Sequence, residues 1–454
     1  MFLSFYGEMN LVKFVSLKKD EMDKKQVFQE IIRDFFQKSL ETVRDREIEV
    51  PFDVPKVVSL MGPRRAGKTH CLFELIKRLR KQMPTEQLVY VNFEDDRLFP
   101  LQLEDLDAML RGYYEMYPGN RNQKVWFFLD EIQEVPNWEK FVRRLQDQEN
   151  CRIYLTGSSS KLLSRELATS LRGRTLPVGV LPLSFREFLQ FNEVEADEFS
   201  SQGKALYVHW LNRYLRQGGF PELVYLPESL HRPTLQEYLD LILYRDVVER
   251  HKIKNTALLR YLLKYLLVNV ANQLSMTKVY NDLKSQGLRI AKNTVFEYLS
   301  YLEEAFVLFK VDVWHQSVRV QAINPSKIYA VDHALKHLMS LSDDQGRIIE
   351  NVVFMELKRR GYHPHYFRNG KEVDFFWQDG ELVNVTVSIA DGATYKRETE
   401  SLFNAMKKTG KKRALLLTMD DEQIIEKYGT IIRVLPLWKF LTADPKRPVF
   451  EDEV

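Results

Sequence analysis

Cysteine is scarce in this chain. Only two of its 454 residues are cysteine, Cys71 and Cys151, and both lie in apolar stretches. Two cysteines indicate neither a disulfide scaffold nor a structural zinc site. This usage favours a reducing compartment, and we expect a cytoplasmic protein.

Long apolar runs are also missing. No stretch approaches the roughly 20 apolar residues that a membrane-spanning helix needs. Residues 1–6 are apolar, but no basic lead precedes them and Glu8 ends the run, so a signal peptide is not indicated. We therefore expect no membrane partner.

The chain has little net charge, because 66 Lys and Arg residues nearly balance 63 Asp and Glu residues and leave +3. Over the whole length this balance does not point to nucleic acid or membranes. Tandem repeats and low-complexity tracts are absent as well. With 44% hydrophobic residues, the composition is that of a globular protein, and the length suggests about three domains.

The most informative segment that is present is Gly62–Thr69, with the sequence GPRRAGKT. It fits the phosphate-binding P-loop pattern, with an apolar strand at 57–61 before it and a helical pattern at 71–79 after it. Glycines let such a loop wrap phosphates, Lys68 adds a positive charge, and Thr69 offers a hydroxyl ligand to Mg²⁺. The predicted nucleotide-binding residues are Gly62, Pro63, Arg64, Arg65, Ala66, Gly67, Lys68, Thr69 and His70.

A second nucleotide element follows about sixty residues later. The apolar strand at 124–129 runs into Asp130 and Glu131, the Walker B pattern. We expect Asp130 to hold Mg²⁺ and Glu131 to orient or deprotonate the attacking water. The predicted cofactors are therefore ATP and Mg²⁺.

Three further side chains are candidates for the same site. Thr156, at the end of the next strand, is expected to contact the γ-phosphate or its water, or else to cap the following helix. Arg172 and Arg174 are candidate arginine fingers, which a neighbouring subunit often supplies, or else solvated surface side chains. A finger acting in trans would make the active form a homo-oligomer.

The fold class is predicted as α/β. Apolar strands at 57–61, 88–93, 124–129, 152–156 and 175–181 alternate with helical patterns, which is typical of a parallel sheet covered on both faces. An amphipathic helix is predicted at 21–40, before the first strand. The predicted domains are a helical lead-in at 1–50, a P-loop NTPase domain at 51–200, a helical linker at 201–257, a winged-helix domain at 258–342, and a small α/β domain at 343–454.

The winged-helix prediction rests on three helical patterns and an expected hairpin, with strands at 307–311 and 318–320. If this module binds DNA, Arg289, Lys292, Asn293 and Thr294 start the recognition helix. The alternative is an adaptor that packs between domains, because the same helix also carries glutamates. Both alternatives stay open at the level of the sequence.

With these motifs in place, the chain resembles a prokaryotic family of P-loop ATPases related to the AAA+ and STAND groups. The resemblance extends from about residue 40 to residue 430. It rests on the two nucleotide elements, on Thr156-Gly157-Ser158 and Leu171-Arg172-Gly173-Arg174, and on Pro182-Leu183-Ser184-Phe185 and Gly218-Gly219-Phe220-Pro221-Glu222. It implies an ATPase domain joined to a winged helix and a C-terminal domain.

The C-terminal part looks like the restriction-endonuclease-like fold of PD-(D/E)xK nucleases. That resemblance implies a helix glutamate, matched by Glu350, and a strand aspartate, matched by Asp374. Thr386 and Ser388 stand where an acid and a lysine are expected. Lys371 and Lys396 are candidate substitutes for the missing lysine, although nothing in the sequence favours them. We therefore predict an inactive nuclease fold.

Three functions follow as hypotheses. The first is a Mg²⁺-dependent ATPase whose cycle rearranges the winged helix and the nuclease-like domain. The second is a nucleotide-gated STAND-like switch or DNA-binding module with slow hydrolysis. The third, an ATP-dependent nuclease, is disfavoured by Thr386 and Ser388.

Overall fold

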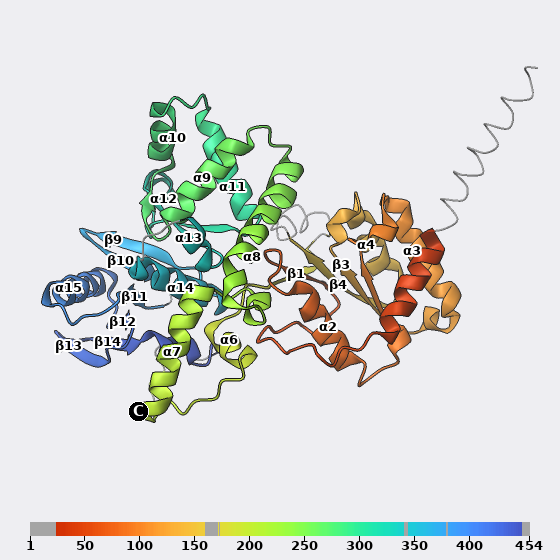
Figure 1. Ribbon diagram of the computed structural model, residues 1–454, viewed down its shortest axis with the longest axis horizontal. Coiled ribbons are helices and arrows are strands. Elements are labelled where there is room, and N and C mark those ends of the chain that lie inside the picture. Colours follow the sequence, from red (N-terminus) through yellow and green to blue (C-terminus); the bar gives the residue numbers. More distant parts are fainter. Residues whose placement is uncertain (1–23, 159–170, 172, 340–343, 378–379, 447–454) are drawn as a thin grey trace, which may run out of the picture. The chain divides into compact units, whose positions relative to one another are not determined.

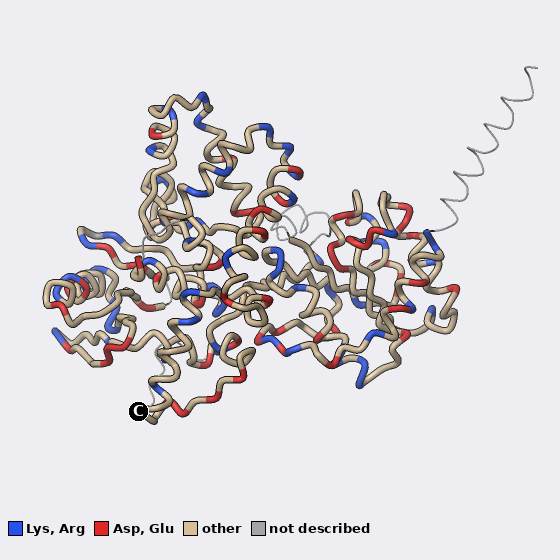
Figure 2. The backbone as a smooth tube through the Cα atoms, in the orientation of Figure 1, with Lys and Arg blue, Asp and Glu red and all other residues tan. Residues whose placement is uncertain are grey.

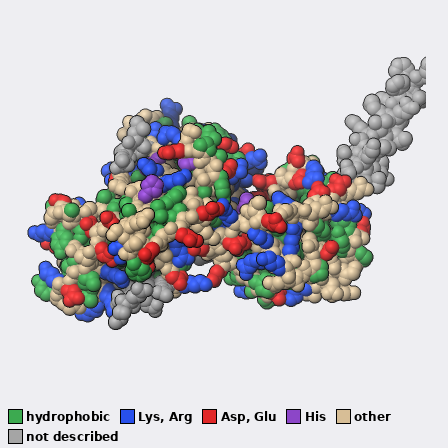
Figure 3. Space-filling view, turned by 60° about the horizontal axis from the view of Figure 1, so that its bottom comes forward, with side chains coloured by type: hydrophobic (Ala, Val, Ile, Leu, Met, Phe, Trp, Pro, Cys, Tyr) green, Lys and Arg blue, Asp and Glu red, His purple; other side chains and the backbone are tan. Residues whose placement is uncertain are grey.

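The computed structural model describes residues 24–158, 171, 173–339, 344–377 and 380–446. By its contacts the chain divides into two compact units, one of Met1–Gly62 and Gly67–Val180, the other of Pro63–Ala66 and Leu181–Val454 (Figure 1). Acidic and basic side chains are interspersed over the face drawn in Figure 3. No helix among these residues is both long and apolar enough to cross a membrane.

The first unit is built on a five-stranded, all-parallel sheet in the order β2-β3-β4-β1-β5. Its strands are β1 (Val57–Met61), β2 (Leu88–Asn92), β3 (Val125–Asp130), β4 (Cys151–Gly157) and β5 (Thr175–Gly179). The helices between them include α2 (Lys68–Leu79), α3 (Leu103–Met116) and α4 (Trp138–Gln148). The α/β prediction and its parallel P-loop NTPase sheet are confirmed.

The lead-in segment is helical at residues 24–37 and packs on this unit. Phe28, Ile31, Ile32 and Phe35 are buried, which is the spacing of one helical face. The ring of Phe35 stacks on Tyr90 of β2 with 4.3 Å between centroids. This helix therefore closes the core next to β2.

The second unit contains most of the helices and the other two sheets. Its helices are α6 (Phe185–Phe191), α7 (Ser201–Gln217), α8 (Glu228–Leu241), α9 (Thr256–Val268), α10 (Met276–Ser285), α11 (Lys292–Glu304), α12 (Val318–Ile323), α13 (Ala334–Met339), α14 (Gln345–Arg359), α15 (Gly392–Thr409) and α16 (Leu437–Thr442). A π-helical stretch, η7 (Ile242–Glu249), continues α8.

A six-stranded mixed sheet occupies the C-terminal part, in the order β13-β14-β12-β11-β10-β9. The strands are β9 (His365–Asn369), β10 (Lys371–Phe376), β11 (Leu382–Val385), β12 (Arg413–Thr418), β13 (Gln423–Lys427) and β14 (Thr430–Pro436). One apolar core runs from Leu183 to Leu441 and includes side chains of α7, α9, α11 and α14. The boundaries of the helical linker at 201–257, the winged-helix domain at 258–342 and the small α/β domain at 343–454 stay predictions.

A three-stranded sheet in the order β6-β8-β7 precedes the six-stranded sheet in the sequence. It consists of β6 (Gln273–Leu274), β7 (Leu308–Val311) and β8 (Ser326–Ala330), and β8 pairs antiparallel with both neighbours. The predicted strand at 318–320 is wrong, because this segment is the short helix α12 and the hairpin partner of β7 is β8. Ser275 caps α10, with its hydroxyl accepting from the Lys278 backbone amide.

Two sequence motifs meet in one turn of the second unit. Gly218 has a φ of 84°, and a Cβ there would lie 2.4 Å from Asp332 Oδ1. The Gly219 amide donates to Asp332 Oδ2 at 2.7 Å, while its carbonyl accepts from the Leu183 amide at 2.6 Å. The Gly218-Gly219 motif is thus explained by close backbone packing in the turn after α7.

Candidate active site

The strand register gathers the predicted nucleotide residues at one edge of the first sheet. Asn92 of β2 lies opposite Asp130 of β3, and Met61 of β1 lies opposite Gly157 of β4. These are the carboxyl ends of parallel strands, where ligands of open α/β sheets bind. The P-loop leaves β1 at this edge.

The backbone of the P-loop has local reasons for its glycines. A Cβ on Gly62 would lie 1.8 Å from the Val180 carbonyl oxygen, so only glycine fits beside the chain leaving β5. Gly67 has a φ of 97° and directly precedes Lys68, the first residue of α2. Left-handed residues at the start of a helix turn backbone N–H groups toward one point, which suits an anion.

Asp130 is fully buried and held by three hydroxyls. Its Oδ2 accepts from Thr69 Oγ1 at 2.8 Å and from Tyr90 at 2.7 Å, and its Oδ1 accepts from Thr156. Burial and the charge of Glu131 raise the pKa of Asp130, while these hydrogen bonds lower it. Carboxylate and hydroxyl oxygens are ligands that Mg²⁺ prefers, so Asp130 and Thr69 fit that cation.

Glu131 adopts a left-handed backbone conformation, with a φ of 52°. Its backbone amide donates to Thr156 Oγ1 at 2.9 Å, its Oε1 lies 3.7 Å from Lys68 Nζ, and its Oε2 accepts from Gln133 Nε2. Lys68 Nζ also donates to the Gly62 carbonyl at 3.2 Å. Strained residues of this kind persist where surrounding contacts fix them, often at functional sites.

The remaining predicted loop residues lie differently. Pro63–Ala66 belong by their contacts to the second unit, where Arg64 Nε lies 3.0 Å from Asp246 Oδ2 in η7. Arg65 lies 3.8 Å from Glu222 and over the ring of Tyr238. His70 is exposed. Whether these residues contact nucleotide stays a prediction.

Of the two candidate fingers, the structure describes Arg174, and it does not bring Arg174 to the acidic pair. Arg174 forms an ion pair with Asp147, the residue before the end of α4. Arg172 lies outside the described residues. Their proposed role in trans therefore also stays a prediction.

Sequence reasoning missed two members of this cluster, Tyr90 and Gln133. The signal for Tyr90 was weak, because a tyrosine in an apolar strand usually belongs to the core. Its ring does pack there, against Phe35 and Phe73, and only its hydroxyl reaches Asp130. Gln133 follows Glu131 by two residues, and this closeness in sequence is the signal for a contact between their side chains.

We expect Tyr90→Phe to weaken Mg²⁺ binding, so that half-maximal ATP turnover needs a higher Mg²⁺ concentration. The phenyl ring preserves the packing, but Asp130 Oδ2 loses one of its two hydrogen bonds. Loss of a group that orients a metal ligand typically costs about 10- to 100-fold in metal affinity or activity. The measurement is turnover as a function of Mg²⁺ concentration at fixed ATP.

Tyr154→Phe is the matched control. Tyr154 is a buried tyrosine of β4 that donates to the Pro51 carbonyl at 3.1 Å and does not touch Asp130. Both variants should lose a similar small amount of stability, about 1 kcal/mol for one hydrogen bond. An unchanged Mg²⁺ dependence in Tyr90→Phe would show that Tyr90 only fills the core.

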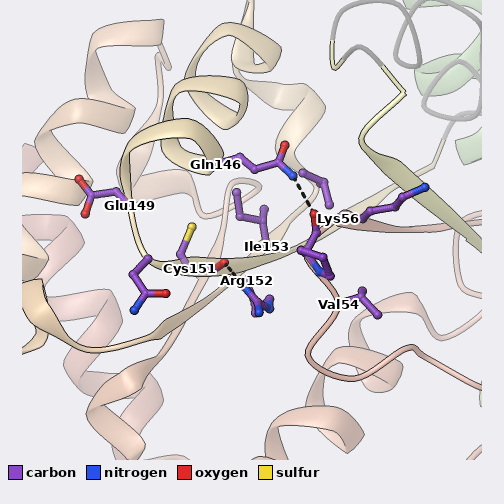
Figure 4. Close-up of a pocket in the computed structure, with 10 residues that line it drawn as sticks. Val54, Lys56, Gln146, Glu149, Cys151, Arg152 and Ile153 are labelled. Atoms are coloured by element: carbon purple, nitrogen blue, oxygen red, sulfur yellow. Dashed lines mark hydrogen bonds between the residues drawn. The ribbon is translucent and has the colours of Figure 1, made fainter.

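A small pocket lies at the opposite edge of the same sheet (Figure 4). Its volume is about 120 Å³, and Val57 of β1 and Cys151–Ile153 of β4 line it from the amino ends of these strands. Gln146 donates to the Pro55 carbonyl across it. The predicted nucleotide residues lie at the carboxyl ends of the strands, where parallel sheets bind ligands. This pocket lies at the amino ends and is therefore separate from them.

The predicted remnant of a nuclease site contains a lysine that the sequence did not reveal. Lys327 of β8 has a side chain that is only 1% exposed, and its Nζ lies 2.8 Å from Glu350, 2.6 Å from Glu372 and 2.9 Å from Asp374. Tyr329 donates to Glu350 at 2.7 Å. A cation therefore sits among the carboxylates, and it is an ammonium group of the chain itself.

The other residues considered for this place lie elsewhere. Lys371 and Lys396 both pair with Glu400 on the exposed side of α15. Thr386 is buried, and Ser388 accepts from the Ala390 amide. Among the described residues, no group of three or more His, Cys, Asp and Glu side chains is arranged to hold a metal ion.

The sheet order, the P-loop and the buried acid beside it define the class as a P-loop ATPase of the AAA type, and a family described as "AAA domain" matches residues 54–189. The chain belongs to the family of the uncharacterized protein MJ1544 of Methanocaldococcus jannaschii. The two are 37% identical over 95% of this chain and 99% of that protein.

Further similarities extend along the chain. An uncharacterized protein of Haemophilus influenzae is 33% identical over 78% of this chain and 86% of its own length. Residues 208–345 and 345–440 match two families described as domains of unknown function, DUF8612 and DUF4143. The chain is also similar to the solved structure of the Walker-type ATPase PABY2304 of Pyrococcus abyssi. The alignment covers 63% of this chain and 91% of that one, at 15% identity and a TM-score of 0.43.

Proposed function

We propose that this protein binds ATP together with Mg²⁺ and hydrolyses it. The observation that carries the proposal is the meeting of Lys68 and Thr69 with Asp130 and Glu131, from segments about sixty residues apart. An isolated glycine-rich turn or an isolated acidic pair would not bring a lysine, a hydroxyl and two carboxylates together. This combination suits a nucleoside triphosphate and its cation.

Each residue has a defined task in this proposal. Lys68 binds the β- and γ-phosphates, and Thr69 and Asp130 hold the cation, which neutralises charge on the transferring phosphate when bound. Glu131 orients the attacking water and accepts its proton. Thr156 fixes Asp130 and the backbone of Glu131 through one hydroxyl.

We also propose that the hydrolysis cycle rearranges the region after Leu181, which comprises a winged helix and a nuclease-like module without nuclease activity. One apolar core connects α7, α9, α11 and α14, which favours movement of both modules as one body. Lys327 fills the place among Glu350 and Asp374 where a nuclease would need its cation, which supports the loss of cleavage.

The second candidate is a nucleotide-gated switch that hydrolyses ATP slowly. The contacts of Glu131 with Lys68 and the side chain of Gln133 favour it, because they occupy the carboxylate that the first candidate needs for the attacking water. The two candidates differ in turnover rate and in self-association. The mass in solution with ATP, with ADP and with a slowly hydrolysed ATP analogue tests whether nucleotide controls assembly.

We expect Lys68→Ala to abolish nucleotide binding and therefore turnover. Wild type at an ATP concentration about 100 times its Kd should gain about 2.7 kcal/mol in unfolding free energy, and Lys68→Ala should gain close to none. The measurements are thermal unfolding with and without Mg²⁺ and ATP, and phosphate release. Lys56→Ala is the control, since Lys56 is exposed at the amino end of β1. Equal turnover and equal stabilisation in all three proteins would refute the proposal.

A further inference from the structure

The segment from Lys252 to Glu297 differs in charge from the rest of the chain. It carries eight Lys and Arg residues and two acidic residues, although the whole chain has a net charge of only +3. The remainder of the chain is therefore negative overall. Figure 2 shows the basic positions along α9, α10 and the turn after it, at the top of the view. The eight are Lys252, Lys254, Arg260, Lys264, Lys278, Lys284, Arg289 and Lys292.

All eight of these side chains belong to exposed residues. Arg260 forms an ion pair with Asp240 at 3.1 Å. The other seven have no ion-pair partner among the described residues. A cluster of exposed cations that the protein does not neutralise itself raises the local positive potential and attracts a polyanion.

The scaffold beneath these cations has the element order of a winged helix. Helix α9, strand β6, helices α10 and α11 and strand β7 follow one another. Strand β8 comes after the short helix α12, and the three strands form one antiparallel sheet. The turn from α10 to α11 contains Gly287, with a φ of 82°. Proteins with this arrangement place the second helix of the pair in the major groove of DNA.

The beginning of α11 is suited to that groove. Ala291 gives the helix no side-chain cap, and its first turn has no acidic residue. Lys292 and Asn293 are exposed there, and Phe296, one turn further, is 44% exposed. Lysine binds phosphate or guanine, asparagine can pair with adenine, and an apolar side chain contacts the methyl group of thymine.

The β7–β8 connection adds a second exposed feature to the same module. Helix α12 exposes Val318 at 77% and Ile323 at 74%, and Arg319 beside them is also exposed. Apolar side chains accompanied by arginine are typical of protein segments that enter the minor groove. A neutral protein partner would explain the apolar pair but not the seven cations for which the described part of the chain offers no ion-pair partner.

We propose that the face formed by α9, α10 and α11 binds duplex DNA, with α11 in the major groove and the surrounding cations on the phosphates. This surface shares no residue with the proposed nucleotide site, and DNA binding goes beyond the proposed ATPase activity. Its failure can therefore be told apart from a failure of that activity.

The experiment measures binding of the full chain to a fluorescent duplex of about 30 base pairs, roughly three helical turns, by anisotropy. Salt is varied from about 50 to 200 mM, because each phosphate contact contributes about −0.9 to the slope of log K against log salt. The test variant is Arg289→Ala with Lys292→Ala. The control is Lys407→Ala with Lys408→Ala, two exposed lysines of α15.

We expect wild type and control to bind with the same steep slope. The Arg289→Ala, Lys292→Ala variant should bind roughly tenfold more weakly and lose about two from the slope, with ATP turnover unchanged. No binding by wild type at the lowest salt would overturn the proposal. So would an unchanged slope in the test variant, or tighter binding of an RNA duplex, whose deep major groove does not admit a helix.

Discussion

Replacing Glu131 by Gln should lower ATP turnover about 10²- to 10⁴-fold and leave ATP binding intact. The amide has nearly the shape of the carboxylate, so it can still accept a hydrogen bond from Gln133, and the left-handed backbone of residue 131 is retained. It cannot accept the proton of the attacking water. Lys68 and Asp130, which bind phosphate and cation in our proposal, are untouched.

The measurement is single-turnover hydrolysis, with binding followed separately by the shift in thermal unfolding. Glu139→Gln serves as the control, because Glu139 is an acidic residue in the first turn of α4 that has no task in our proposal. A variant that loses binding as well as turnover would mean that Glu131 holds the loop together through Lys68. Unchanged turnover would remove Glu131 from the chemistry.

Local sequence was sufficient for the parts of this site that lie within one strand–loop–helix segment. The P-loop and the Asp130-Glu131 pair are predictable because glycine, lysine and carboxylate chemistry allows few alternatives at those positions. Tyr90 and Lys327 were not predictable in the same way. Each acts on an acid at least 23 residues away through strand pairing or helix packing, which no local pattern encodes.

The hairpin after β7 shows the same limit for the fold. Val318-Arg319-Val320 has β-branched residues in alternation, which predicts a strand. Nothing in the described residues pairs with this segment as a ladder, and it forms α12 instead. The true partner, β8, is stabilised by antiparallel pairing on both sides, which outweighs its mixed composition.

Lys327 is a buried residue whose loss should strongly destabilise the second unit. Three carboxylates lie within 2.9 Å of its ammonium group, and they come from α14 and β10 while Lys327 comes from β8. Burial alone would lower the pKa of Lys327, but Asp374, Glu350 and Glu372 raise it well above its ordinary value. The lysine is therefore charged when folded and compensates acids that would otherwise repel one another.

Lys327→Met should reduce the unfolding free energy by about 3 to 5 kcal/mol, the usual cost of removing one partner from a buried charge cluster. The loss should also depend on pH. Burial and the charge of Asp374 raise the pKa of Glu350 from 4.5 to about 7, so the folded protein holds a proton there that the unfolded chain releases. Stability from this group is therefore present at low pH and falls as pH rises between these values.

Without the ammonium group, the pKa of Glu350 should rise further, because Lys327 now lowers it. The destabilisation by Lys327→Met should then be smaller at about pH 5, where Glu350 is protonated, than at about pH 8. Lys336→Met is the matched control, since Lys336 is also a buried lysine but its ammonium group lies 3.8 Å from Asp344 alone among the described carboxylates. Equal losses in the two variants, or a loss independent of pH, would show that Lys327 contributes packing and not charge compensation.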